Sequence, residues 1–99
     1  MFIELNEKNF EKETARGLKL IEFHAEWCGY CKMLNNILKD FEKIWIGQIN
    51  VDKSPGLAKK FQAFSYPTLV FLKDGKEVDR LRGVYPKNDI MERIMKHLK

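Results

Sequence analysis

Short apolar segments bounded by turn residues recur along this 99-residue chain and predict β-strands. Residues 18–24, Leu-Lys-Leu-Ile-Glu-Phe-His, are nearly continuous in apolar side chains, a pattern typical of a strand covered on both faces. The Asp74-Gly75 pair predicts a tight hairpin turn between the last two segments. We therefore expect five strands, over residues 2–5, 18–24, 44–51, 68–72 and 77–82.

Other segments repeat apolar residues at helical spacing. The clearest stripe consists of Met33, Leu34, Ile37, Leu38 and Phe41. Asn6 and Ser54 are suited to N-cap positions, Pro55 to the first turn that follows, and Gly17 to a C-terminal cap. We expect helices over 7–16 and 32–43, a third that opens at Pro55, and a fourth that opens at Pro86.

The expected element order is β-α-β-α-β-α-β-β-α, in a single domain of residues 1–99. Helices separate the first three strands, which favours parallel pairing through right-handed crossovers. The hairpin makes the last two strands antiparallel to each other. The pattern therefore predicts an α/β fold whose central mixed five-stranded sheet carries helices on both faces.

Composition narrows the functional classes. Hydrophobic residues make up 44% of the chain and charged residues 32%, with a net charge of +4. Lysine and arginine are spread along the chain, so we favour a soluble basic surface, able to steer acidic partners, over a nucleic-acid footprint. The N-terminus lacks signal-peptide character and no apolar run reaches membrane-spanning length, which favours a cytoplasmic protein. A mature exported form that starts at an engineered methionine remains an alternative.

The only two cysteines, Cys28 and Cys31, lie between an apolar strand and a helical stripe. A thiol pair at that junction indicates redox chemistry that needs no cofactor. One alternative is half of a metal site, to which only His24 and His97 could add ligands within the chain. A metal ion that bridges two chains is another.

The segment Phe23-His24-Ala25-Glu26-Trp27-Cys28-Gly29-Tyr30-Cys31-Lys32 resembles the active-site segment of the thioredoxin family, and Tyr66-Pro67-Thr68-Leu69 resembles its proline loop. The Asp74-Gly75 hairpin and Gly83 also match the family. The resemblance covers the whole chain in length and element order. It implies the thioredoxin fold and a thiol–disulfide oxidoreductase with a redox-active Cys28–Cys31 disulfide.

Three residues are expected to carry the catalysis. Cys28 at a helix start is the expected nucleophile, because free backbone N–H groups and the helix dipole favour its thiolate, with Lys32 adding positive charge. Cys31, one turn on, is expected to resolve the mixed disulfide. Glu22 interrupts an apolar strand, so we expect a buried carboxyl group with a raised pKa that accepts the Cys31 proton. The alternative is a water-exposed glutamate at a strand edge.

The resemblance also implies a substrate-binding surface, made by Trp27, Gly29, Tyr30, Tyr66, Pro67 and Gly83. Pro67 is expected to be cis and to present the Tyr66 backbone to a substrate strand; the alternative is an ordinary trans turn. Trp27 has the alternative of a packing residue, and Gly83 that of a strand-end glycine. Asp52 is expected to hydrogen-bond near Trp27, or to be an ordinary turn aspartate.

The sequence departs from the family at several positions. Tyr30 stands where thioredoxins usually carry proline, which favours a weaker helix start or a more oxidising potential. His24 replaces a large aromatic residue, either as a partly protonated imidazole that supports the Cys28 thiolate or as a filler of that space. Gln48 replaces a lysine, so burial should dominate the Glu22 pKa. Asn35-Asn36 stand where the helix usually has an internal proline.

The resemblance implies a monomeric reductant of disulfide-containing protein substrates, recharged by a thioredoxin reductase or another dithiol donor. An oxidase or isomerase of the same fold is the alternative suggested by Glu22 and Tyr30. A thioredoxin-like binding module, whose thiols are dispensable, is another. No nucleic acid, membrane or metal partner is expected.

Overall fold

All residues, 1–99, are described by a computed structural model, in which the strands form one sheet of order β1-β3-β2-β4-β5. Their bounds are β1 (Phe2–Leu5), β2 (Leu18–His24), β3 (Ile46–Asn50), β4 (Thr68–Lys73) and β5 (Lys76–Arg82). β1 and β2 pair in parallel with β3, whereas β4 is antiparallel to both β2 and β5. The expected mixed five-stranded sheet is thus confirmed, with β2 at its centre.

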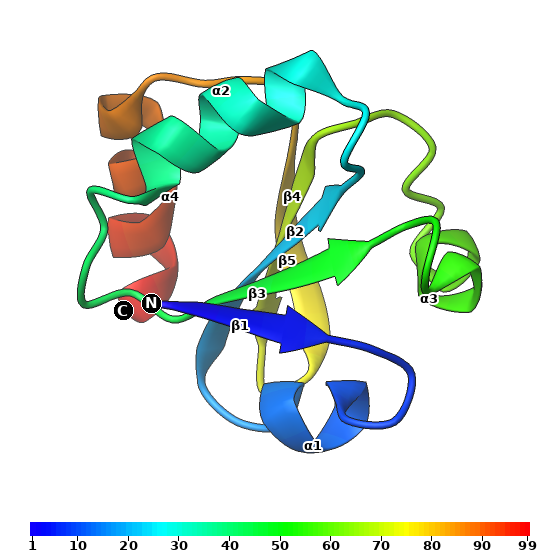
Figure 1. The fold of residues 1–99 in the computed structure, drawn as a ribbon. Helices are drawn as coiled ribbons and strands as arrows, with labels where there is room; N and C mark the ends of the chain where they lie inside the picture. The colour runs from blue at the N-terminus through cyan, green and yellow to red at the C-terminus, as the bar shows by residue number, and fades with distance from the viewer.

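Four helices cover the two faces of this sheet (Figure 1). Their bounds are α1 (Phe10–Thr14), α2 (Gly29–Leu38), α3 (Pro55–Lys60) and α4 (Lys87–Leu98). One core cluster joins α1 and α3 to the sheet, and the other joins α2 and α4 to the opposite face. Since successive strand residues face opposite ways, Leu20 of β2 lies in the second cluster while Ile21 and Phe23 lie in the first. Glu22 therefore points toward α2.

The first helix is shorter than the predicted 7–16, which was wrong at both ends. The Asn6 side chain accepts hydrogen bonds from the backbone N–H groups of Lys8 and Asn9, at 2.8 and 3.1 Å. Asn9 Oδ1 in turn accepts from the Asn6 N–H at 2.8 Å. These reciprocal bonds close a polar turn, and the helix begins only after it, at Phe10. The helix then stops at Thr14, three residues before Gly17, whose φ is 78°.

The second helix begins at Gly29, three residues before the predicted start, and ends at Leu38 rather than residue 43. Beyond Leu38 the backbone hydrogen bonds span three residues instead of four, as in a 3₁₀ turn. The Asp40 N–H donates to the Ile37 carbonyl and the Phe41 N–H to the Leu38 carbonyl. Phe41 is nevertheless only 3% exposed. The apolar stripe therefore continues through a turn after the helix. For this reason the side-chain periodicity predicted a helix end later than the observed one. None of the four helices has both the length and the apolar character to cross a membrane.

Candidate active site

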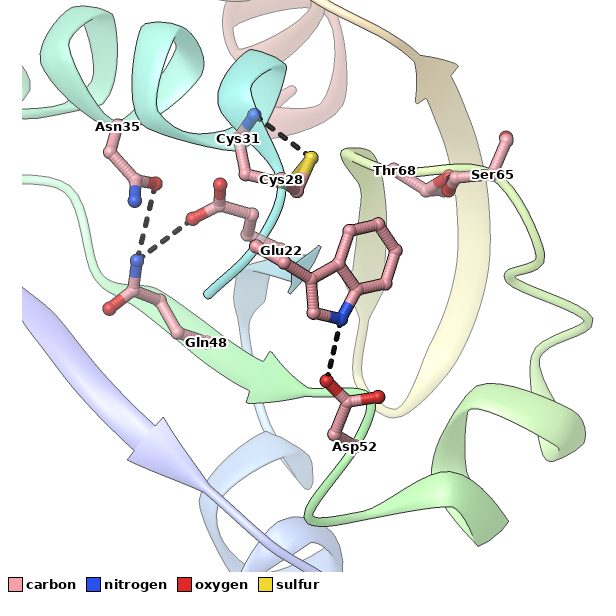
Figure 2. The surroundings of a disulfide bond; sticks show 9 residues. Glu22, Cys28, Cys31, Asn35, Gln48, Asp52, Ser65 and Thr68 are labelled. Atoms are coloured by element: carbon pink, nitrogen blue, oxygen red, sulfur yellow. Dashed lines mark hydrogen bonds between the residues drawn. A yellow bond between two sulfur atoms is a disulfide. The ribbon is translucent and has the colours of Figure 1, made fainter. Parts of the chain in front are cut away.

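Cys28 and Cys31 form a disulfide at the start of α2 (Figure 2). Cys28 is the N-cap residue with extended backbone, and its sulfur accepts a hydrogen bond from the Cys31 N–H at 3.2 Å. The sulfur of Cys28 thus occupies the place where a helix N-terminus stabilises negative charge. Both residues are buried, Cys31 more completely than Cys28. In the reduced protein, this geometry favours the Cys28 thiolate and leaves Cys31 shielded behind it.

Glu22 is fully buried at the centre of the sheet, with 0% of its surface exposed. Burial raises the pKa of its carboxyl group from 4.5 to about 7, although a hydrogen bond from Gln48 acts in the opposite direction. The expectation of a desolvated acid with a pKa dominated by burial is confirmed, and the alternative of an exposed strand-edge glutamate is wrong. A carboxyl group with this pKa can both accept and return a proton near neutral pH.

Two amide side chains flank that carboxyl group (Figure 2). Gln48, the neighbour of Glu22 in the β2–β3 register, donates from Nε2 to Glu22 Oε1 at 2.9 Å. Asn35 reaches the same carboxyl group from α2, and its amide also lies 3.4 Å from Gln48 Nε2. Asn35 follows Cys31 by four residues, so the two share a face of α2. Glu22 therefore contacts α2 about one helical turn beyond Cys31, a rise of roughly 6 Å along the helix axis.

Trp27 lies on the surface beside the disulfide, with 68% of its area exposed, which rules out the packing alternative. Its indole Nε1 donates to Asp52 Oδ2 at 2.8 Å, which is the first of the two alternatives given for Asp52. Its ring and the Tyr66 ring pack in a T-shaped arrangement with a centroid distance of 6.1 Å. These two contacts hold the exposed indole in one orientation between the disulfide and the proline loop.

The Tyr66-Pro67 peptide bond is cis, so the trans alternative is excluded. Thr68 Oγ1 donates to the Ser65 carbonyl at 2.6 Å, and Gly83 N–H donates to the Pro67 carbonyl at 2.8 Å. Gly83 adopts a φ of 98°, and a Cβ added there would meet no atom within 4 Å. Hydrogen bonds to Ser65 and Pro67 thus hold the proline loop in place, and Gly83 leaves open space next to it.

The remaining candidate residues surround this centre. Tyr30 is 67% exposed in the first turn of α2, and Lys32, two residues on, is also exposed. Burial lowers the pKa of His24, against the opposing charges of Glu26 and Glu4. That direction favours a neutral imidazole, hence the space-filling interpretation of His24 over the partly protonated one.

The two histidines do not join the cysteines in a ligand set. His97 pairs with Asp79 of β5 at 2.9 Å, far along the chain from the disulfide. No cluster of three or more histidine, cysteine, aspartate or glutamate side chains has an arrangement suited to a metal ion.

Asn35 is the site residue that sequence reasoning missed, since it was considered only as a substitute for a helix proline. The available signal was its spacing of four residues from Cys31. An amide on the thiol-bearing face of a helix that covers a buried acid is a candidate hydrogen-bond partner for that acid.

Comparison with known proteins agrees with this geometry. The family model described as Thioredoxin matches residues 1–96. The thioredoxin of Chlamydia caviae is 44% identical over 94 residues, which cover 91% of this chain and 92% of that protein. The thioredoxin of Staphylococcus haemolyticus is 37% identical over 101 aligned positions, with 97% of each chain covered. With the fold, the disulfide at the helix start and these relatives in agreement, the chain belongs to the thioredoxin family of thiol–disulfide oxidoreductases.

Proposed function

We propose that this protein works mainly as a reductant of protein disulfides, through Cys28 and Cys31. The Cys28 thiolate attacks one sulfur of the target disulfide, the target S–S bond breaks, and the other target sulfur leaves as a thiolate. Cys31 then attacks Cys28, which releases the second target thiolate and closes the Cys28–Cys31 bond. Two electrons pass to the target for each disulfide formed here. The position of the Cys28 sulfur at the N-cap of α2 is the observation that carries this proposal.

Glu22 is the proposed acceptor of the Cys31 proton. The resolving step needs a Cys31 thiolate, yet Cys31 is buried away from water. An acid whose pKa is raised by burial to about 7, one helical turn away, suits the transfer at neutral pH. In the reverse reaction the same carboxyl group returns the proton.

The proposed docking surface comprises the exposed aromatics Trp27 and Tyr30, the backbone of Tyr66 and Pro67, and the open space at Gly83. A substrate segment that pairs with the Tyr66 backbone as an added strand would bring its disulfide to Cys28. Gly29, in the first turn of α2, carries no side chain to block that approach. Specificity would then depend on the main chain of the substrate more than on its side chains.

We further propose that the chain acts as a cytoplasmic monomer, recharged by a thioredoxin reductase or another dithiol donor. Reduction of the Cys28–Cys31 disulfide is the step that such a donor would supply. The family assignment supports a donor of this kind, since thioredoxins are reduced by thioredoxin reductase.

One experiment tests direction and donor together. The protein is equilibrated with glutathione redox buffers to obtain its potential, and insulin disulfide reduction is then followed with a thioredoxin reductase and NADPH. We expect a potential near the thioredoxin value of about −270 mV and turnover that Cys28→Ser abolishes. Cys31→Ser should instead accumulate the mixed disulfide. A potential near about −180 mV, with no reductase-dependent turnover, would contradict the proposal.

The second candidate is an oxidase or isomerase of the same fold. It is favoured by Tyr30, which replaces a restraining proline between the cysteines and is largely exposed. Tyr30→Pro provides the discriminating variant. If Tyr30 makes this protein more oxidising, the substitution should lower the potential and speed insulin reduction, and refolding of a reduced disulfide protein should slow.

A further inference from the structure

The Asn35 amide lies against the Glu22 carboxyl group, and only its nitrogen, not its oxygen, finds acceptors there when Glu22 is ionised. With its nitrogen turned toward Glu22, Asn35 donates to Oε2 at 2.6 Å and to Oε1 at 2.7 Å. With its oxygen turned there instead, Asn35 Oδ1 accepts from Gln48 Nε2 at 3.4 Å (Figure 2). Gln48 Nε2 also donates to Glu22 Oε1, at 2.9 Å.

Each orientation matches one protonation state of Glu22. A carboxylate only accepts hydrogen bonds, so it requires the Asn35 nitrogen. A carboxylic acid has one O–H donor, which requires an acceptor at that place, the Asn35 oxygen. Placing that oxygen against an ionised carboxylate would set acceptors face to face in a buried site, which is costly.

We propose that Asn35 is a positioning residue for Glu22: its amide donates to the ionised carboxylate and reverses to accept from the protonated acid. Gln48 donates to Oε1 of the carboxyl group in both states. The two amides therefore hold the carboxyl group in the same position in its protonated and its ionised state. The consequence for mixed-disulfide resolution rests on the function proposed above, whereas the exchange of hydrogen bonds does not.

No charged side chain contacts the Glu22 carboxyl group and could hold it in place through an ion pair. On its own strand, His24 is the next titratable residue on the same face of the sheet. Across Gln48 lies Glu4 of β1, which is exposed at the sheet edge. On the other side β4 contributes Leu69. Of the two helices on this face, α2 contributes Cys31 and Asn35, while the buried residues of α4 are Ile90 and Ile94. Neutral amides thus replace an ion pair as the means of holding the acid.

The test follows both side chains by NMR in the oxidised protein, between about pH 5 and pH 9. The probes are the Glu22 carboxyl ¹³C resonance and the Asn35 side-chain NH₂ resonances. We expect both to titrate with one midpoint. In Asn35→Leu the Glu22 midpoint should rise by about one pH unit, because a charge-assisted hydrogen bond to the carboxylate is stronger than the neutral bond to the acid.

Asn36→Leu is the matched control, since Asn36 is the exposed neighbour on the same helix, and its Glu22 midpoint should be unchanged. Asn35→Ala, which a helix accepts readily, replaces Asn35→Leu if leucine prevents folding. The proposal is overturned if the Asn35 NH₂ resonances stay constant through the Glu22 titration, or if neither Asn35 variant moves the midpoint.

A kinetic measurement separates this inference from the proposed function. Single-turnover resolution of the mixed disulfide is followed against pH, with Cys28 alkylation as the reference. We expect the resolution midpoint to rise in Asn35→Leu together with the NMR midpoint, while alkylation is unchanged. A shift in the NMR midpoint with a pH-independent resolution rate supports the Asn35 role and contradicts the proton-transfer role of Glu22.

Discussion

Glu22 makes the folded protein less stable as pH rises. The folded chain holds the Glu22 proton up to a pKa of about 7, whereas an ordinary glutamate loses it near 4.5. Between these values the native state binds more protons than the unfolded state, so stability falls with increasing pH. The difference between the two pKa values corresponds to a destabilisation of about 3 kcal/mol. This destabilisation is complete above the folded pKa and absent below the unfolded pKa. A buried acid at this position costs stability at neutral pH, so its presence fits a chemical role and not a stabilising one.

Glu22→Gln should therefore stabilise the oxidised protein by about 3 kcal/mol above about pH 8, because glutamine has no charge to desolvate. Below about pH 4 the gain should vanish, since Glu22 is then protonated in both states. Urea unfolding across this range measures the difference. Glu92→Gln, an exposed position on α4, is the control and should change stability little at any pH. A gain of equal size at every pH would indicate better packing and not a removed charge.

At the scale of single residues, the sequence was informative where neighbours along the chain define the chemistry. The spacing of Cys28 and Cys31 and the polar interruption at Glu22 are both local patterns, and the structure bears out the disulfide and the burial. The Asn35 contact was not predictable in this way. It depends on how α2 lies over β2, and that placement follows from tertiary packing of apolar residues far apart in sequence.

At the scale of elements, the type and order of every helix and strand were predictable, whereas several ends were not. Strand alternation and helical stripes report which side chains are buried, and burial does not require regular backbone. Phe41 shows this most clearly, since it is buried from a turn outside α2. The polar turn at Asn6 shows the converse case, where side-chain hydrogen bonds delay a helix that capping preferences would start earlier.

β3 depends on a glycine for its close packing. A Cβ added at Gly47 would lie 2.8 and 2.9 Å from ring carbons of Trp45 and would also collide with Leu5. The indole of Trp45 fills the space above Gly47 and is itself covered by the Lys19 ammonium, 4.4 Å from the ring centroid. Leu5 is buried in the core and Trp45 packs against the same cluster, so neither neighbour moves freely.

Gly47→Ala should destabilise the protein by roughly 1–3 kcal/mol, because the methyl group forces the Trp45 ring or β1 to move. Chemical denaturation gives the free energy, and Trp45 fluorescence in the native state reports the displaced ring. Gly29→Ala is the contrasting variant: an added Cβ there meets no atom within 4 Å. That helical position should gain up to about 1 kcal/mol. Equal effects from the two substitutions would rule out the packing explanation.

At the scale of the whole molecule, the active site is assembled from segments that the sheet order brings together. β2 supplies Glu22, its neighbour β3 supplies Gln48, and the cis peptide at Pro67 directly precedes the other neighbour, β4. The alternation of strands and helices predicted parallel pairing among the first three strands, and the Asp74-Gly75 hairpin predicted the antiparallel β4–β5 pair, whereas the antiparallel β2–β4 pair was not predicted. The alternation did not predict the side-chain pairs across the sheet, because these depend on register, which the pattern leaves open.

The far end of the sheet is closed by a cluster at Asp79, which ties β5 to α4. Asp79 Oδ1 accepts from Arg93 Nη1 at 2.7 Å, and Oδ2 lies 2.9 Å from His97 Nε2. Partial burial alone would raise the pKa of Asp79, but hydrogen bonds from His97, the Arg80 backbone and Arg93 outweigh it and lower the pKa below the ordinary 3.8. For an acid with a lowered pKa, the stabilisation is complete above the unfolded value and is lost as pH falls through the folded one.

Asp79→Asn should accordingly destabilise the protein at pH 7 by about 1–3 kcal/mol, because the amide cannot accept both charge-assisted bonds and turns a donor toward Arg93 or His97. As the pH falls below 3.8, the wild-type carboxylate itself becomes protonated, so the difference between the two proteins should shrink. Urea unfolding at neutral and acidic pH measures both values, and hydrogen exchange should place the loosening in α4. The insulin-reduction rate of the folded variant should match that of the wild type, since Asp79 lies outside the catalytic and docking residues. If the loss of unfolding free energy in Asp79→Asn were as large at acid pH as at neutral pH, the packing of Asp79 and not its charge would stabilise the contact between β5 and α4.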